Sequence, residues 1–306
     1  MTIDPIALAA ATLGLATPLL LAALGELVAE RAGILNVGVE GLMLVGAFAG
    51  MLGSWASGSP TLGMLCACGG ALVVAALFAL WVVVLDVEQV VAGVAVNLLA
   101  LGATGVLYRA LFGQTGSALT VATFAPLAIA PDVAALAPLR QPLPVYVALA
   151  LVPAVWFFLA RTRLGLRLRA AGEAPQAAES VGVHVGAMRV GAILVAAVFA
   201  GAAGGYLSLA YSNTFVEGMS AGRGFIALAI VVFGRWRPSG ILIGAWLFGA
   251  ASALQFQLQA AGVAVPYHLL LMLPYVLTLL VLALTSRDAR GPAALALRRR
   301  QTAAAD

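Results

Sequence analysis

Residues 61–85, TLGMLCACGGALVVAALFALWVVVL, form an apolar stretch without a charged side chain. A helix needs about 20 such residues to cross the hydrocarbon core of a bilayer. Similar stretches recur along the chain, which is 63% hydrophobic and 9% charged, with a mean hydropathy of +1.07. Soluble domains carry about 25% charged residues, and no alternating pattern indicates a barrel. The sequence therefore predicts an all-α, polytopic membrane protein.

The apolar pattern predicts about nine membrane segments (a range of about eight to ten), some of them short or broken. They lie at residues 6–24, 37–53, 61–85, 89–112, 144–160, 190–210, 225–234, 239–258 and 267–285. The segment at 225–234 is too short to cross about 30 Å at about 1.5 Å per residue, so we expect it to be tilted, broken or re-entrant. Asn36 and Glu40 interrupt the start of the second segment. Interrupted segments of this kind often mark the substrate path of a transporter.

The arginines predict the orientation of the chain. The interval 161–189 is strongly polar, and all 16 basic residues of the chain are arginine. Cytoplasmic loops of membrane proteins carry an excess of basic residues. With 161–189 in the cytoplasm, only Arg109, Arg140 and Arg223 of the 16 face outside. This orientation places the N-terminus outside, the C-terminus inside, and Glu26, Glu30 and Arg31 near the inner surface.

The same topology divides the chain into parts. Residues 1–290 form the predicted transmembrane domain, and 291–306 form a cytoplasmic tail that we expect to be disordered. The interval 113–143 is rich in Pro, Ser and Thr, and predicts an external loop with at most a short helix.

Several kinds of chemistry are excluded. A Walker A loop and Schiff-base catalysis both require lysine, and the chain has none. Any ATP hydrolysis therefore belongs to another subunit, and we expect neither catalytic residues nor a cofactor in this chain. Cys66 and Cys68, like His184 and His268, lack the spacing of metal ligands, so no metal site is predicted.

The interval 172–182, GEAPQAAESVG, predicts a short helix with Pro175 in its first turn and Gly182 just past its end. Glu173 lies near the positive end of that helix, and Ala177, Ala178 and Val181 share one side. Because two turns of helix are unstable alone in water, the helix must pack against something. It is either an ordinary interfacial loop or a docking helix for a cytoplasmic partner.

Four blocks of the chain together resemble a known family. They are RLRAAGEAPQAAESVGV (167–183), GELVAERAGILNVGVEGLMLVGAFAG (25–50), DVEQVVAGVAVNLLALG (86–102) and GRGFIALAIVVFGRWRPSG (222–240). They resemble, in order, the motifs of permease subunits of bacterial ABC importers of the branched-chain amino acid, ribose and nucleoside type. The first resembles the cytoplasmic coupling loop, and the second is most similar to the nucleoside and simple-sugar branch.

The resemblance implies a permease that moves a nucleoside or a related small polar solute across the bacterial cell membrane by alternating access. Its implied partners are a second homologous permease, two cytoplasmic ATP-binding subunits (or one fused ATPase), an external substrate-binding lipoprotein and membrane lipid. ATP and Mg would be used by the ATPase. The residues implied to dock on the ATPase are Arg169, Gly172, Glu173, Ala178, Glu179 and Gly182.

Polar and aromatic residues within the segments are candidates for the substrate path. They are Asn36, Glu40, Gln89, Asn97, Phe225 and Gln255. Glu40 either lines an aqueous path or caps a broken helix, since a carboxylate in the bilayer is costly. Asn97 either faces the path or bonds a neighbouring helix. Phe225 either stacks on a base or sugar, or packs against lipid or protein.

Other functions fit the sequence less well. A simple-sugar ABC permease stays open as an alternative. An ion-coupled secondary transporter would favour several deep acidic residues and would leave the docking helix unexplained. An intramembrane enzyme would require a cluster of Asp, His or metal ligands at the interface, and the sequence has no such cluster.

Overall fold

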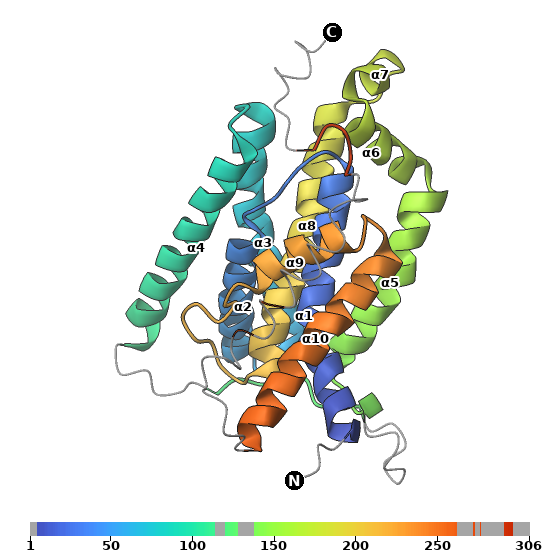
Figure 1. The fold of residues 1–306 in the computed structure, drawn as a ribbon. Coiled ribbons are helices and arrows are strands. Elements are labelled where there is room, and N and C mark those ends of the chain that lie inside the picture. Colours follow the sequence, from blue (N-terminus) through green and yellow to red (C-terminus); the bar gives the residue numbers. More distant parts are fainter. Residues whose placement is uncertain are drawn as a thin grey trace.

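The computed structural model describes residues 5–113, 120–127, 138–261, 272, 276 and 291–295, and over these residues the chain is a bundle of helices (Figure 1). Seven helices are long and apolar enough to cross a membrane. They are α1 (Pro5–Arg31), α2 (Val39–Ser57), α3 (Pro60–Ala79) with a π-helical end at Leu80–Val84, α4 (Gln89–Phe112), α5 (Leu143–Arg161), α8 (Val185–Tyr206) with a π-helical end at Leu207–Tyr211, and α10 (Pro238–Ala260). The predicted all-α, polytopic class is confirmed.

Eight of the nine predicted segments fall within the described residues, and each contains a helix. The described residues contain the seven spans and the short α9 (Arg223–Phe233), which corresponds to the segment expected at 225–234. Its 11 residues cover about 16 Å, roughly half of the hydrocarbon core. The ninth predicted segment, 267–285, lies outside the described residues except for 272 and 276.

Helix α1 forms the centre of the bundle. Every residue from Leu15 to Glu30 is buried, and the helix packs against α8, α9 and α10. We expected this segment to end at residue 24, with Glu26 and Glu30 near the inner membrane surface. The helix instead continues to Arg31, and both carboxylates have partners inside the bundle. Glu26 Oε1 accepts a hydrogen bond from the backbone N–H of Asn36 at 2.8 Å, and Glu30 accepts one from the indole N–H of Trp236.

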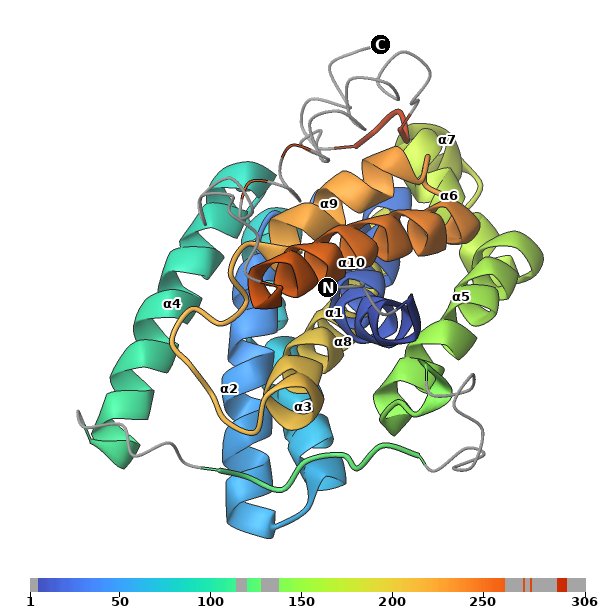
Figure 2. The same ribbon diagram turned by 60° about the horizontal axis from the view of Figure 1, so that its bottom comes forward.

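Helices α2, α3 and α8 pack closely on one another beside α1. Small residues allow this approach: a Cβ on Gly204 of α8 would lie 1.9 Å from the carbonyl oxygen of Met43 on α2. Helices α4 and α5 lie at opposite edges of the bundle (Figures 1 and 2). Both expose apolar side chains, including Leu98 on α4 and Phe157 on α5, as expected of helices that face lipid or another membrane subunit.

The two ends of the bundle differ in character. Two short helices, α6 (Arg163–Glu173) and α7 (Pro175–Ser180), lie at the end where α1 finishes, at the top of Figure 1. We call this the α6–α7 end. At the opposite end one described part of the predicted loop, 120–127, runs across the bundle (Figure 2), and Ser54 Oγ on α2 donates to the carbonyl oxygen of Ala122 at 2.7 Å. That stretch contains no α-helix.

Candidate functional site

The interval predicted to hold one short helix contains two, which together form a hairpin. The hydroxyl of Thr162 starts α6 by accepting from the backbone N–H of Gly165 at 3.0 Å. Pro175 opens α7, and Gly182 follows it with φ +84°, as its position in the sequence predicted. Sequence patterning missed α6 because the stretch R-L-G-L-R-L-R alternates polar and apolar residues, which is not a helical period.

One side of the α6–α7 hairpin is buried against the bundle. Ala178 packs with Ala171 and Val185 and is 3% exposed. Gly172 is buried too, and it lies so close to α1 that a Cβ there would be 2.3 Å from the carbonyl oxygen of Arg31. Arg169 is half-buried, and its Nε has no hydrogen-bond partner within the described chain. Of the six residues implied to dock on an ATPase, these three therefore face the protein in this conformation.

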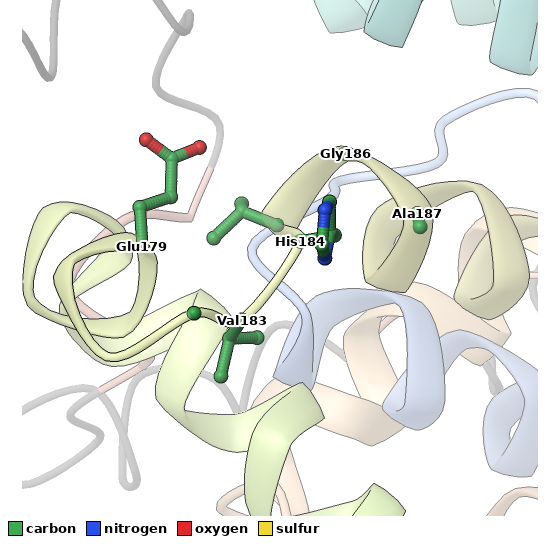
Figure 3. Close-up of a pocket in the computed structure, with 7 residues that line it drawn as sticks. Glu179, Val183, His184, Gly186 and Ala187 are labelled. Atoms are coloured by element: carbon green, nitrogen blue, oxygen red, sulfur yellow. The ribbon is translucent and has the colours of Figure 1, made fainter.

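The other side of the hairpin is open. Glu173, Glu179 and Gly182 are exposed there, and so is Val181, at 78%. A cavity of about 460 Å³ lies between α7 and the start of α8, lined by residues that include Glu179, Gly182 and His184 (Figure 3). Sequence analysis assigned His184 no role, because it lies far from His268 and lacks the spacing of a metal ligand. This side of the hairpin offers a groove to a partner.

The second polar region surrounds the α1–α2 connector (residues 32–38), which is not helical. Backbone groups away from water need partners, and side chains from other helices supply them here. Gln89 Oε1 accepts from the N–H of Leu35 at 2.7 Å. Asn97 Nδ2 donates to the carbonyl of Val37 at 3.0 Å, and its Oδ1 accepts from the N–H of Gly41 at 2.8 Å. Asn97 thus fastens α4 to the start of α2.

Glu40 joins this region to α9. Its two carboxylate oxygens accept from the N–H groups of Gly222 at 2.8 Å and Gly224 at 2.7 Å, at the first turn of α9. A carboxylate at a helix N-terminus meets unpaired N–H groups and the positive end of the dipole. Both glycines are required: Gly222 has φ +80°, and a Cβ on Gly224 would lie 2.6 Å from Cα of Glu40. Glu40 therefore takes the capping arrangement, one of the two that its sequence position allowed.

The remaining predicted path residues are placed differently. Asn36 is 1% exposed, and its side-chain amide has no hydrogen-bond partner in the described part of the chain. Phe225 lies in the first turn of α9, beside the Glu40 cap, and is 48% exposed. Gln255 is buried on α10, which packs mainly on α1, α5 and α9. The structure brings Asn36, Glu40, Gln89 and Asn97 together around the connector, and places Gln255 on a separate helix.

With this geometry established, the relationship to known proteins is clear. The sequence profile of the family described as "Branched-chain amino acid transport system / permease component" matches residues 8–282. The chain belongs to this permease family. The resemblance seen in the sequence is therefore confirmed over nearly the whole chain.

Several curated relatives carry substrate names. The permease is 44% identical to the "Putative glucose ABC transporter permease protein" of Haloferax volcanii, over 83% of this chain and 78% of the relative. It is 35% identical to the guanosine ABC transporter permease of Bacillus subtilis, over 89% of each chain. It is also 35% identical to the nucleoside ABC transporter permease of Lactococcus lactis, over 91% of this chain and 92% of the relative. No solved structure matches the permease.

The sequence did not predict how the two polar regions of the permease are joined. Gly172 of α6 packs against residues 31–33, where Gly33 has φ +84°, and Arg189 Nε donates to the carbonyl of Ala32 at 3.4 Å. Part of the tail that we expected to be disordered also docks here. The N–H of Ala294 donates to the carbonyl of Gly172 at 2.9 Å, and Ala294 is 2% exposed. The hairpin thus rests directly on the connector.

Proposed function

We propose that this permease is the membrane-spanning subunit of an ABC importer that moves a nucleoside into the cell by alternating access. The observation that carries the proposal is the α6–α7 hairpin of a permease-family chain, which presents an exposed groove at the arginine-rich end of the bundle. The excess of arginine assigns that end to the cytoplasm and the N-terminal end of α1 to the outside of a bacterial cell membrane.

Each proposed partner of the permease has a separate task in transport. A second homologous permease completes the solute path, an external binding lipoprotein delivers the solute, and two ATP-binding subunits (or one fused ATPase) consume ATP with Mg. This chain contributes no catalytic residue. Its exposed docking residues are Glu173, Glu179 and Gly182, to which the structure adds Val181. Arg169, Gly172 and Ala178 support the same hairpin from its buried side.

The contacts within the chain supply a route for coupling. When the ATP-binding subunits close, the hairpin moves with them, and Gly172 transmits that movement to residues 31–33. The connector that follows is bonded to α4 through Gln89 and Asn97. Because α2 begins at the end of the connector and Glu40 holds α9, the movement reaches every element that contains a predicted path residue except α10.

Phe225 and Asn36 are the best-placed candidates for contact with the solute. Phe225 is an exposed aromatic ring beside a capped helix terminus, where a nucleobase can stack on it. The side-chain amide of Asn36 is buried without a partner in the described residues. Its NH₂ group can therefore donate to a solute, and its oxygen can accept from one. The near full-length match to two curated nucleoside permeases favours a nucleoside.

A simple sugar is the second candidate. One relative named for glucose has a higher identity, 44%, than the guanosine permease, 35%. A nucleoside and a sugar share hydroxyl groups, so Asn36 would serve either solute. Phe225 does not distinguish the two solutes, because aromatic rings stack on sugars as well as on bases. Uptake assays are therefore needed to separate them.

The solute is tested by uptake. Radiolabelled guanosine, ribose and glucose are supplied to cells of the native host with and without this chain. We expect ATP-dependent guanosine uptake to fall on deletion and to return with the gene. Loss of glucose or ribose uptake alone would replace the nucleoside by a sugar, while unchanged uptake of all three would reject both candidates.

The docking role is tested with two matched glycines. Gly182 after α7 and Gly58 after α2 both have positive φ, +84° and +67°, and a Cβ would meet nothing within 4 Å at either. We expect Gly182→Trp to abolish co-purification of the ATP-binding subunit, and Gly58→Trp, at the opposite end, to leave it intact. Equal co-purification by both variants would remove the hairpin from the ATPase contact.

A further inference from the structure

A second cavity at the α6–α7 end is not explained by transport or by docking of the ATPase. It measures about 380 Å³ and lies between the end of α5, α6 and the turn that joins α9 to α10. Its lining includes three arginines, two tryptophans and a hydroxyl: Arg31, Arg169, Arg237, Trp156, Trp236 and Ser239.

The positive charge in this cavity is only partly balanced. Arg31 donates to the carbonyl of Trp236, with its Nη2 at 2.7 Å, and its Nη1 lies 3.8 Å from Glu173 Oε1. Arg169 has a buried Nε without a hydrogen-bond partner in the described chain, and no ion pair of Arg237 is found there either. Glu173 therefore offsets part of this charge, and Glu30, which accepts from the indole of Trp236, is a second carboxylate close to Arg31. Neither forms an ion pair with Arg169 or Arg237 in the described chain, so the cavity keeps an excess of positive charge.

The backbone adds to this positive potential. Helix α10 begins at Pro238, on the wall of the cavity, and its N-cap residue Arg237 makes no side-chain cap bond. The first N–H groups of a helix are unpaired and carry the positive end of its dipole. A fourth arginine is nearby, since the guanidinium of Arg161 lies 6.0 Å from the ring centre of Trp156. The cavity is thus suited to an anion with several oxygen atoms, such as a phosphate.

The surface next to the cavity is apolar and lies on the membrane-spanning part of α10. Ser239, Ile243 and Trp246 are spaced at i, i+4 and i+7, so they share one face of α10. Ile243 is 62% exposed and Trp246 is 43% exposed. This face begins at the cavity and runs along α10 toward the middle of the bundle. On the α5 side, Trp156 is 50% exposed, which suits a tryptophan at the membrane interface.

We propose that this cavity binds the phosphate headgroup of an anionic phospholipid, whose acyl chains lie along the Ile243–Trp246 face of α10. Basic pockets between membrane helices on the cytoplasmic side recognise such headgroups. A free phosphate would use the arginines but not the apolar face. A cytoplasmic protein partner would leave that face uncovered, because it lies on the membrane-spanning part of α10.

The test compares Arg237→Gln with Arg163→Gln. Both variants remove one exposed arginine at the same end of the protein, and Arg163 does not line the cavity. The purified full chain is titrated with phosphatidylglycerol or phosphatidylcholine in neutral detergent, and retained lipid is counted by native mass spectrometry. We expect the wild type to retain phosphatidylglycerol preferentially, and Arg237→Gln to weaken that retention about fivefold. Arg163→Gln should stay within about twofold of the wild type.

A second variant separates binding from folding. Ser239→Asp adds a carboxylate at the start of α10, where it favours the helix but repels a phosphate in the cavity. We expect its thermal stability to be unchanged or higher and its retention of phosphatidylglycerol to fall. Equal retention by Arg237→Gln, Ser239→Asp and the wild type would overturn the proposal.

Two further outcomes identify another ligand. Competition by inorganic phosphate at the same concentration as the lipid would assign the cavity to a free phosphate ion. Unchanged lipid retention with loss of ATPase co-purification in Arg237→Gln would assign it to a protein contact. Either result overturns the lipid proposal without affecting the proposed transport function.

Discussion

The α6–α7 hairpin and the α1–α2 connector both interrupt the membrane helices, yet they satisfy their backbones in opposite ways. In the hairpin, short helices bond their own backbone and leave Glu173, Glu179 and Val181 exposed. In the connector, backbone groups of residues 32–38 form hydrogen bonds with the side chains of Glu26, Gln89 and Asn97. The hairpin therefore exposes polar side chains to a partner, whereas the side chains around the connector bond its backbone and maintain the fold.

The largest expected effect lies at the connector. Glu40→Ala removes a part-buried carboxylate from two N–H groups, and bonds to charged groups contribute about 1.5–3 kcal/mol each, so we expect a loss of about 3 kcal/mol. Glu88→Ala is the matched control, since Glu88 also accepts from two N–H groups, at the start of α4, but through exposed bonds. Its expected cost is about 1 kcal/mol. Equal losses in equilibrium unfolding would contradict the difference between a part-buried and an exposed cap.

The next largest effect is expected where the hairpin contacts the connector, at Gly172. Gly172→Ala places a Cβ against a backbone oxygen that cannot rotate away, so we expect a loss of about 2 kcal/mol and weaker coupling of ATP hydrolysis to uptake. Gly182→Ala meets no atom and carries only the strain of its positive φ, about 1 kcal/mol. Thermal melting and ATPase assays of the assembled importer measure both. A smaller effect at Gly172 than at Gly182 would show that the hairpin does not rest on the connector.

Asn97→Ala separates the structural role from the transport role. It leaves the N–H of Gly41 and the carbonyl of Val37 unpaired, at a cost of about 1–2 kcal/mol within a membrane. We expect stability to fall and the KM for uptake to stay unchanged in the protein that still assembles. A raised KM at unchanged stability would instead place Asn97 on the solute path.

The smallest expected effect on stability is in the hairpin. Val181 is 78% exposed, so Val181→Asp should change the free energy of unfolding by no more than about 0.5 kcal/mol. We expect co-purification of the ATP-binding subunit to fall about fivefold, because a charge then enters the contact. A variant that unfolds, or that binds the ATPase as well as wild type, would remove the contrast between an exposed hairpin and a buried connector.

The sequence predicted those features that depend on composition and local pattern. Uncharged stretches such as 61–85 predicted the helical membrane class, and Pro175 with Gly182 predicted the limits of α7 correctly. The short segment at 225–234 exists as α9. These features need only information from neighbouring residues.

Features that depend on distant partners were not predictable. The burial of Glu26 and Glu30 within the protein could not be predicted, because only the fold brings their hydrogen-bond donors, Asn36 and Trp236, beside them. Glu40 had two possible roles until Gly222 and Gly224 were placed beside it. For the same reason, the buried sides of Gly172 and Ala178 could not be told from their sequence positions.

The brevity of α9 has a mechanical consequence. Its 11 helical residues follow a non-helical stretch, 212–222. The length of this part of the chain is therefore not set by a helix alone, as it would be in a continuous helix. A residue advances the chain by about 3.3 Å when extended and by about 1.5 Å when helical. Each residue that winds onto α9, or unwinds from it, shifts its first turn by about 2 Å. Glu40 bonds that first turn through the N–H groups of Gly222 and Gly224, so a single carboxylate determines where α9 begins.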